Sequence, residues 1–241
     1  MNTSNKKKIE KQQNKFGWSL EQLEENAKRC KSAAVLHEMA VECYKNEVIC
    51  FYIAKNRYTS PKTLAFLSNH PNDSVRRTVA GKSDEIPYCD NIKELTENDF
   101  NSPEDYRNAK VFNSVLLKLA LDTNREVKEE LSRTVKSEKI KMLLYKSNPS
   151  NEKIIGNCLR RISDMDFIRD FIRTNAYLNS GKKLSLYDKD ILSNTNLTSM
   201  ELLTFIVHCP KLSEKHAQMI RKSNGYNRLV EVLLKENCPA A

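Results

Sequence analysis

The chain has 241 residues, of which 39% are hydrophobic and 29% charged, and its formal net charge is +9. Its 5 glycines are all isolated, which excludes glycine-rich phosphate-binding loops and disfavours a protein built from tight β-hairpins. No apolar run approaches the length of a membrane span, and the polar, lysine-rich start lacks the apolar core of a secretory signal.

The positive charge is concentrated in two segments. Residues 1–15 carry a net charge of +4 and residues 106–183 carry +8, whereas residues 16–105 carry −4. Concentrated positive charge attracts phosphate groups or acidic partners, although Lys and Arg on solvated helix faces produce the same count. We expect residues 1–18 to form a basic, mobile tail.

Helix-start signals recur along the rest of the chain. A Ser or Thr followed three residues later by Gln or Glu is typical of a capping box, and Ser-Pro places an N-cap before a proline at the first helical position. These signals predict short helices starting at Ser19, Ser60, Ser102, Thr123 and Thr198. Ser213 is a further N-cap candidate, and it predicts a helix over residues 214–220.

The spacing of apolar residues between these starts is helical. Leu64 and Leu67, and then Val75 and Val79, are spaced as on one buried helix face. Residues 83–108 are acidic and broken by prolines, and they predict an irregular insertion. The pattern as a whole indicates an all-α chain of many short helices.

Two pairs of segments resemble each other. Residues 64–75 align without gaps to residues 116–127, with Asn72 opposite Asn124. A fainter match relates Ile53-Ala-Lys-Asn56 to Ile191-Leu-Ser-Asn194. Chance similarity between amphipathic helices explains matched leucines, but it explains a matched turn residue less easily. We therefore favour a repeated pair of helices, which buries its apolar face by stacking on its neighbours.

One of these segments resembles a known family. Residues 53–81 contain Ile-Ala-Lys-Asn, Thr-Ser-Pro, Leu-Ala-Phe-Leu and Asp-Ser-Val-Arg-Arg-Thr-Val-Ala in that order, which resembles the variant leucine-rich repeat, a HEAT-like α-solenoid family. Residues 116–131 match this pattern only at its leucine and valine positions. Residues 140–155 and 191–207 match it at fewer positions still. The resemblance implies a right-handed solenoid of short helical units, here one domain over residues 19–241. It implies no reaction, and it implies a structural role for Arg76, paired with an acidic side chain or a turn carbonyl.

The 7 cysteines are odd in number and irregularly spaced, which predicts reduced thiols and a cytoplasmic location. Some members of the resembled family hold an iron–sulfur cluster on cysteines near the N-terminus. The cysteines near the N-terminus therefore have two possible roles: they are small buried side chains, or they bind a metal together with His37. The candidates are Cys30, Cys43, Cys50 and Cys89. Because no Cys-x-x-Cys pair occurs, we expect no metal and no cofactor.

Catalytic motifs are absent from the sequence, so we assign no catalytic residue. His70 lies in a turn, and His208 and His216 are too loosely spaced to indicate a metal site. Asp164 and Asp166 are consistent with a carboxylate pair, but they also fit the start of a helix.

The candidate anion-binding or nucleic-acid-binding residues are cations in the basic middle third. Two of them, Arg169 and Arg173, repel each other on one helix face unless acids such as Asp166 and Asp170 compensate; if those acids turn away, the cations can follow a phosphate backbone. The full set is Arg160, Arg161, Arg169, Arg173, Lys182 and Lys183. Three tyrosines either stack on bases or belong to the core, namely Tyr145, Tyr177 and Tyr187.

These observations lead to two main hypotheses. The first is a non-enzymatic interaction scaffold that binds a protein partner through a solenoid surface. The alternative is a protein that binds DNA or RNA through residues 106–183 and the N-terminal lysines. An enzyme or metalloprotein on a solenoid is a weaker third hypothesis, and no membrane partner is expected.

Overall fold

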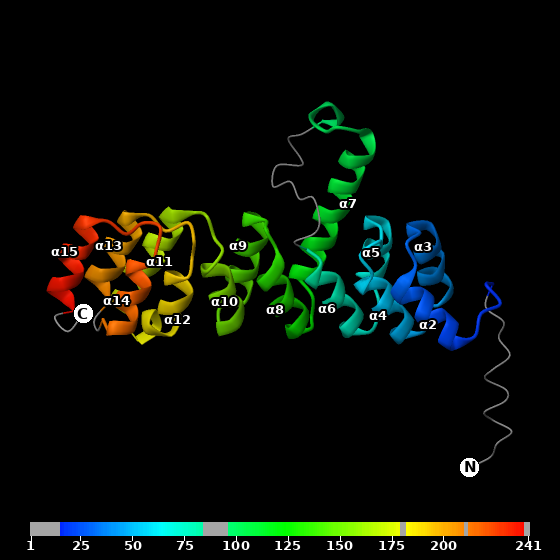
Figure 1. The fold of residues 1–241 in the computed structure, drawn as a ribbon, viewed down its shortest axis with the longest axis horizontal. Helices are drawn as coiled ribbons and strands as arrows, with labels where there is room; N and C mark the ends of the chain where they lie inside the picture. Colours follow the sequence, from blue (N-terminus) through cyan, green and yellow to red (C-terminus); the bar gives the residue numbers. More distant parts are fainter. Residues whose placement is uncertain (1–14, 84–95, 179–181, 210–211, 239–241) are drawn as a thin grey trace, which may run out of the picture. The chain divides into compact units, whose positions relative to one another are not determined.

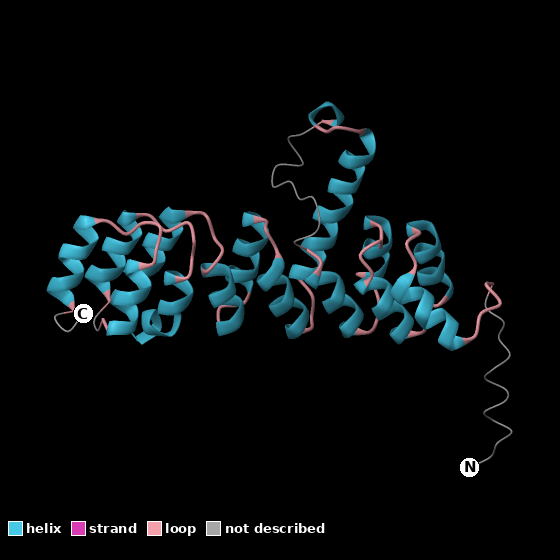
Figure 2. Ribbon diagram, viewed as in Figure 1, coloured by secondary structure: helices cyan, strands magenta, loops and turns pink. Residues whose placement is uncertain are grey.

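The computed structural model describes residues 15–83, 96–178, 182–209 and 212–238. In residues 176–178 and 182–185, on either side of the 179–181 gap, it describes the backbone alone. All regular secondary structure in these residues is helical, which confirms the predicted all-α class (Figure 2). None of the described helices combines the length and the apolar character that crossing a bilayer requires. Cys89 lies outside the described residues, as do residues 1–14 of the predicted tail.

The chain forms two compact units, divided between Val135 and Lys136, where we expected one domain over residues 19–241. The helices of the first unit are α2 (Leu20–Arg29), α3 (Ala33–Glu42), α4 (Glu47–Lys55), α5 (Pro61–Leu67), α6 (Asp73–Gly81), the 3₁₀ helix η1 (Glu97–Asp99), α7 (Pro103–Ala120) and α8 (Arg125–Thr134) (Figure 1). Those of the second are α9 (Glu138–Ser147), α10 (Glu152–Leu159), α11 (Met165–Leu178), α12 (Lys182–Leu192), α13 (Ser199–His208), α14 (Glu214–Arg221) and α15 (Arg228–Asn237).

Within each unit, helices pack against the helix two places along the chain. In the first unit α2, α4, α6 and α8 lie side by side in one row, and α3, α5 and α7 form a second (Figure 1). In the second unit α10, α12 and α14 form one row, and α11, α13 and α15 form the other. The residues predicted to be core by their spacing, Leu64, Leu67, Val75 and Val79, are all buried in the first unit.

Most predicted helix starts are present. Ser19 and Thr198 form complete capping boxes, and Ser60, Ser102 and Ser213 accept hydrogen bonds as N-caps. A hydroxyl cap accepts hydrogen bonds from amide groups that have no partner inside the helix. Because this contact is local, the spacing of cap residues predicts helix starts without knowledge of the tertiary contacts.

Two expectations about local structure are wrong. The start predicted at Thr123 lies one residue later, because Asn124 caps α8 and accepts from the Glu126 amide at 2.7 Å. Residues 83–108 are not irregular throughout, since η1 and the first turns of α7 lie in this range. At the end of the predicted tail, Lys15 Nζ lies 2.8 Å from Glu38 on α3.

The two asparagines of the fainter sequence match play the same part in the two units. Asn56 follows α4 and donates from Nδ2 to the carbonyl groups of Ala27 and Cys30, both at 2.9 Å. Asn194 follows α12 and donates to the carbonyl groups of Leu159 and Ile162 at 2.8 and 2.7 Å. Each asparagine thus caps the C-terminal end of the preceding helix in its row.

The stronger match has a structural counterpart at the other end of the helices. Asn72 caps α6 and donates from Nδ2 to Glu47 on α4, and Asn124 caps α8 and donates to Asp73 on α6. The matched asparagines therefore connect successive helices of one row as well as capping their own.

Candidate functional site

The predicted anion-binding arginines lie on α10, the following loop and α11. Arg160 is the C-cap of α10 and forms an ion pair with Asp190 on α12. The two helices approach closely here, because a Cβ atom added to Gly156 would meet the Asp190 carboxylate. Arg160 therefore joins two neighbouring helices of one row.

Arg169 is engaged more deeply. Its guanidinium donates to Glu201 on α13, whose side chain is 0% exposed, and to Asp166 on its own helix. Burial raises the pKa of Glu201, but hydrogen bonds from Thr198 and Arg169 outweigh it, and the net pKa is lowered. The hydrogen bond to Glu201 in turn raises the pKa of Arg169. Arg169 is thus a charged link between α11 and α13.

The remaining candidates are more exposed. Arg173 Nη1 lies 3.8 Å from Asp170, so the acids near these arginines face them. Arg161 is exposed and has no carboxylate partner among the described residues. The side chains of Lys182 and Lys183 lie outside the described residues. The structure therefore places three of the four described arginines in ion pairs within the second unit.

The two candidate tyrosines whose side chains the structure describes, Tyr145 and Tyr187, are packed against other rings. Tyr145 lies 5.0 Å from the ring of Phe167, and Tyr187, which is buried, lies 5.9 Å from the ring of Phe171. Burial raises the pKa of both hydroxyl groups. These rings belong to an aromatic cluster of the second unit, in which Tyr145 is half-buried and Tyr187 is buried. The side chain of Tyr177 lies outside the described residues.

Within the part of the chain that the structure describes, the metal-binding alternative has no assembled ligand set. Among the described residues, no group of three or more His, Cys, Asp or Glu side chains is arranged to hold a metal ion. Cys43 and Cys50 are buried, and the Cys50 thiol donates to the Cys43 carbonyl group at 3.4 Å. Burial raises the pKa of Cys50 to about 12, which keeps this thiol protonated. His37 hydrogen-bonds Thr63 through Nδ1.

The other histidines make local contacts. His70 accepts from the amide of Asn72 at 3.1 Å and donates from Nε2 to the Tyr44 carbonyl group at 2.8 Å, as expected for a turn residue. His208 and His216 make separate contacts, His208 to the Thr204 carbonyl group and His216 to the Asp188 carboxylate.

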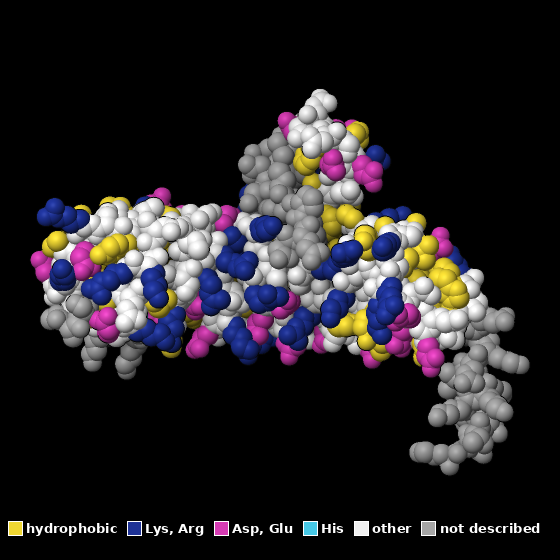
Figure 3. Space-filling view, viewed as in Figure 1, with side chains coloured by type: hydrophobic (Ala, Val, Ile, Leu, Met, Phe, Trp, Pro, Cys, Tyr) yellow, Lys and Arg dark blue, Asp and Glu magenta, His cyan; other side chains and the backbone are white. Residues whose placement is uncertain are grey.

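An apolar surface on α13 and α15 was not predicted. Met200, Val207, Leu229 and Val232 expose between 49% and 62% of their surface, and α13 packs directly against α15. We call these four residues the α13–α15 apolar surface. Figure 3 shows hydrophobic side chains at the surface of this end of the second unit. The sequence signal is in α13, which is apolar on almost every side and cannot bury all of its faces in a unit of two helix rows.

No family model matches this chain. Comparison with curated proteins and with solved structures likewise finds no similar protein. The resemblance to the variant leucine-rich repeat therefore stays a sequence-based prediction, and the function must be argued from the surfaces described above.

Proposed function

We propose that the protein is a non-enzymatic scaffold that binds a protein partner through the α13–α15 apolar surface. Its architecture in this proposal is a right-handed α-solenoid of short HEAT-like units. Two features support the solenoid: each described unit has two rows of helices, and Asn56 and Asn194 cap the preceding helix of their row in the same way. A cytoplasmic location is part of the proposal, and the free thiols of the described cysteines support it.

The observation that carries the proposal is the exposure of four large apolar side chains on two adjoining helices. Met200 and Val207 are seven residues apart on α13, and Leu229 and Val232 are three apart on α15, so each pair lies along one helix face. Where exposed apolar side chains form contiguous surface, that surface is uncommon on monomeric proteins and marks interaction sites. Covering it with a partner's apolar side chains removes it from water, which is the main driving force of association.

The test replaces two of these residues with charge. We expect Met200→Glu with Leu229→Glu to weaken binding of a captured and then purified partner at least about 10-fold, because a buried unpaired carboxylate opposes association. The matched control is Val41→Glu with Val48→Glu, which changes two exposed valines of the first unit. Calorimetric titration of all three proteins measures the affinities.

Two results would contradict the proposal. One is an affinity that is unchanged in the α13–α15 variant or lowered equally in the control. The other is wild-type self-association that the α13–α15 variant abolishes in sedimentation equilibrium, since the surface would then serve a second copy of the chain.

DNA or RNA binding through residues 106–183 and the N-terminal lysines was the alternative expected from charge. We do not adopt it for the arginines, because Arg160, Arg169 and Arg173 already face acidic partners. Segment 106–183 is also divided between the two units.

A further inference from the structure

A group of cations and partly exposed aromatic rings lies on α4, just after it and on the neighbouring helix α2. Lys28 Nζ lies 4.2 Å from the ring centre of Tyr52, Lys55 Nζ lies 6.0 Å from that of Phe51, and the Arg57 guanidinium lies 4.7 Å from that of Tyr58. We call these six residues the α4 basic–aromatic patch. Phe51 and Tyr52 also meet edge to face, with ring centres 5.5 Å apart.

The fold holds this patch together through Asn56. Its side chain bonds the carbonyl groups at the end of α2, which fixes the C-terminal end of α2 beside that of α4. Lys28 and Tyr52 therefore come from different helices but share one place on the surface. The buried Lys82 donates to the Asn56 carbonyl group at 2.6 Å, so its ammonium group lies beside the C-terminal end of α4.

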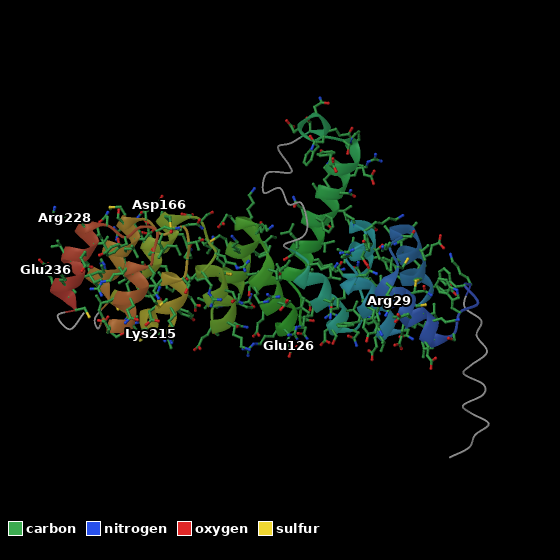
Figure 4. All side chains as sticks on the ribbon, in the orientation of Figure 1. Arg29, Glu126, Asp166, Lys215, Arg228 and Glu236 are labelled. Carbon is green, nitrogen blue, oxygen red and sulfur yellow. The ribbon has the colours of Figure 1, made fainter. Side chains whose placement is uncertain are left out.

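The cations of the patch are only weakly neutralised. Lys55 and Arg57 have no carboxylate within 4.0 Å among the described residues, and Glu24 lies 3.9 Å from Lys28. Figure 3 shows Lys and Arg side chains over α4 and its neighbours in the first unit. Figure 4 shows that Arg29, the last residue of α2, also lies over this region, although it pairs with Glu25.

Cations at the C-terminal ends of helices compensate the helix dipole, which explains part of this arrangement. The dipole does not account for the three partly exposed rings that accompany the cations. A surface that interleaves aromatic rings with weakly neutralised cations matches single-stranded nucleic acid, whose bases stack on rings while its phosphates contact Lys and Arg. Duplex bases are stacked on one another and cannot use such rings.

We propose that the α4 basic–aromatic patch binds single-stranded RNA or DNA without sequence preference. Bases stack on Tyr52 and Tyr58, and Lys55 and Arg57 contact the backbone phosphates. This site goes beyond the scaffold proposal, because it lies on the first unit and shares no residue with the α13–α15 apolar surface. Each proposal can therefore fail while the other stands.

The test is a fluorescence-anisotropy titration of the full chain with a labelled 15-nucleotide oligo(U) and oligo(dT), at about 50 and 200 mM salt. We expect Tyr52→Leu to weaken binding about 10-fold and Tyr52→Phe to bind as the wild type does, because the ring is what stacks. Lys55→Glu with Arg57→Glu should also weaken binding and should lower the slope of log K against log salt by about 1.4.

The matched control reverses the same charge elsewhere. Lys215 and Lys222 are exposed on and after α14, and Lys215→Glu with Lys222→Glu should leave the affinity within about 2-fold of wild type. Circular dichroism melts check that each variant is folded. Because Lys55 and Arg57 are exposed, their charge reversal tests the site independently of the partly buried Tyr52.

Three outcomes would overturn the site. The first is the absence of saturable binding at about 50 mM salt. The second is an equal loss of affinity in the Lys215 and Lys222 control. The third is that a polyglutamate peptide or the matching duplex binds as tightly as the single strands do, while Tyr52→Leu has no effect. That result would identify a surface for acidic proteins or for general polyanions.

Discussion

Arg76 and Asp122 form a two-point ion pair that joins α6 to the turn between α7 and α8. Arg76 Nε donates to Asp122 Oδ2 at 2.7 Å and Nη2 donates to Oδ1 at 3.0 Å. Arg76 Nη1 also donates to the carbonyl groups of His70 and Pro71, both at 2.8 Å. The sequence resemblance implied an acidic or carbonyl partner for this arginine, and the structure supplies both. The pair is mostly buried, with 15% and 8% of the two side chains exposed.

Removing the charge of Asp122 should destabilise the first unit. Asp122→Asn keeps the shape but removes the charge-assisted hydrogen bonds, and we expect a loss of about 2 kcal/mol in the free energy of unfolding. Urea titration followed by circular dichroism measures it. Glu126→Gln is the matched control, because Glu126 pairs with Arg77 at an exposed site where such pairs contribute little. Equal effects of the two substitutions would show that burial does not strengthen the Arg76 pair.

The same pair predicts a pH dependence. Burial raises the pKa of Asp122, but hydrogen bonds from Arg76 and from the Asn124 amide outweigh it, so the pKa in the folded state is below the unfolded value of about 3.9. Its stabilising contribution is therefore complete above the unfolded pKa and is lost as the pH falls through the folded pKa. Unfolding free energies measured from pH 7 to pH 3 should fall less in Asp122→Asn than in wild type. Parallel pH curves for the two proteins would refute this contribution.

Asn56 and Asn194 should be costly to replace. Each side chain is buried and hydrogen-bonds backbone carbonyl groups of the preceding helix in its row, and those carbonyl groups lose their partner in Asn56→Ala or Asn194→Ala. We expect each substitution to cost about 2–3 kcal/mol, from the lost bonds and the unsatisfied acceptors. The exposed Asn69, which bonds the Ala65 carbonyl group on the preceding helix α5, is the control, and Asn69→Ala should cost well under half as much. Chemical denaturation of the four proteins decides between these expectations.

The sequence identifies local structure well because caps and apolar spacing act within a few residues. Ser60 and Ser102 before proline mark helix starts correctly, and the matched Asn72 and Asn124 occupy equivalent caps. The Thr123 prediction failed because the neighbouring Asn124 is an equally good cap, and spacing alone does not rank the two.

The candidate site was harder to predict because charge counts ignore partners. Four of the six candidate residues in 106–183 are arginines, yet Arg169 is held by Glu201, which lies 32 residues away in sequence. Conversely, residues 16–105 have a net negative charge, which concealed Lys55 and Arg57 beside aromatic rings. Only the packing of α2 against α4 brings Lys28 into the same group.

Gly225 provides a test of how the end of the second unit is packed. It lies in the turn between α14 and α15, and a Cβ atom there would lie 2.8 Å from the Ser199 amide nitrogen and still closer to the Thr198 carbonyl group. Because backbone atoms at the start of α13 cannot move aside as a flexible side chain can, Gly225→Ala should destabilise this unit by about 1–3 kcal/mol.

The matched substitution is Gly81→Ala, where the nearest atom is Glu130 Oε1 at 3.0 Å, the end of a flexible side chain. Alanine also has a higher helix propensity than glycine, so Gly81→Ala should be nearly neutral. Thermal melts should therefore show a lower Tm for Gly225→Ala and little change for Gly81→Ala. If Gly225→Ala also moves α15 relative to α13, it should weaken binding at the α13–α15 apolar surface, whereas Gly81→Ala should leave that binding intact.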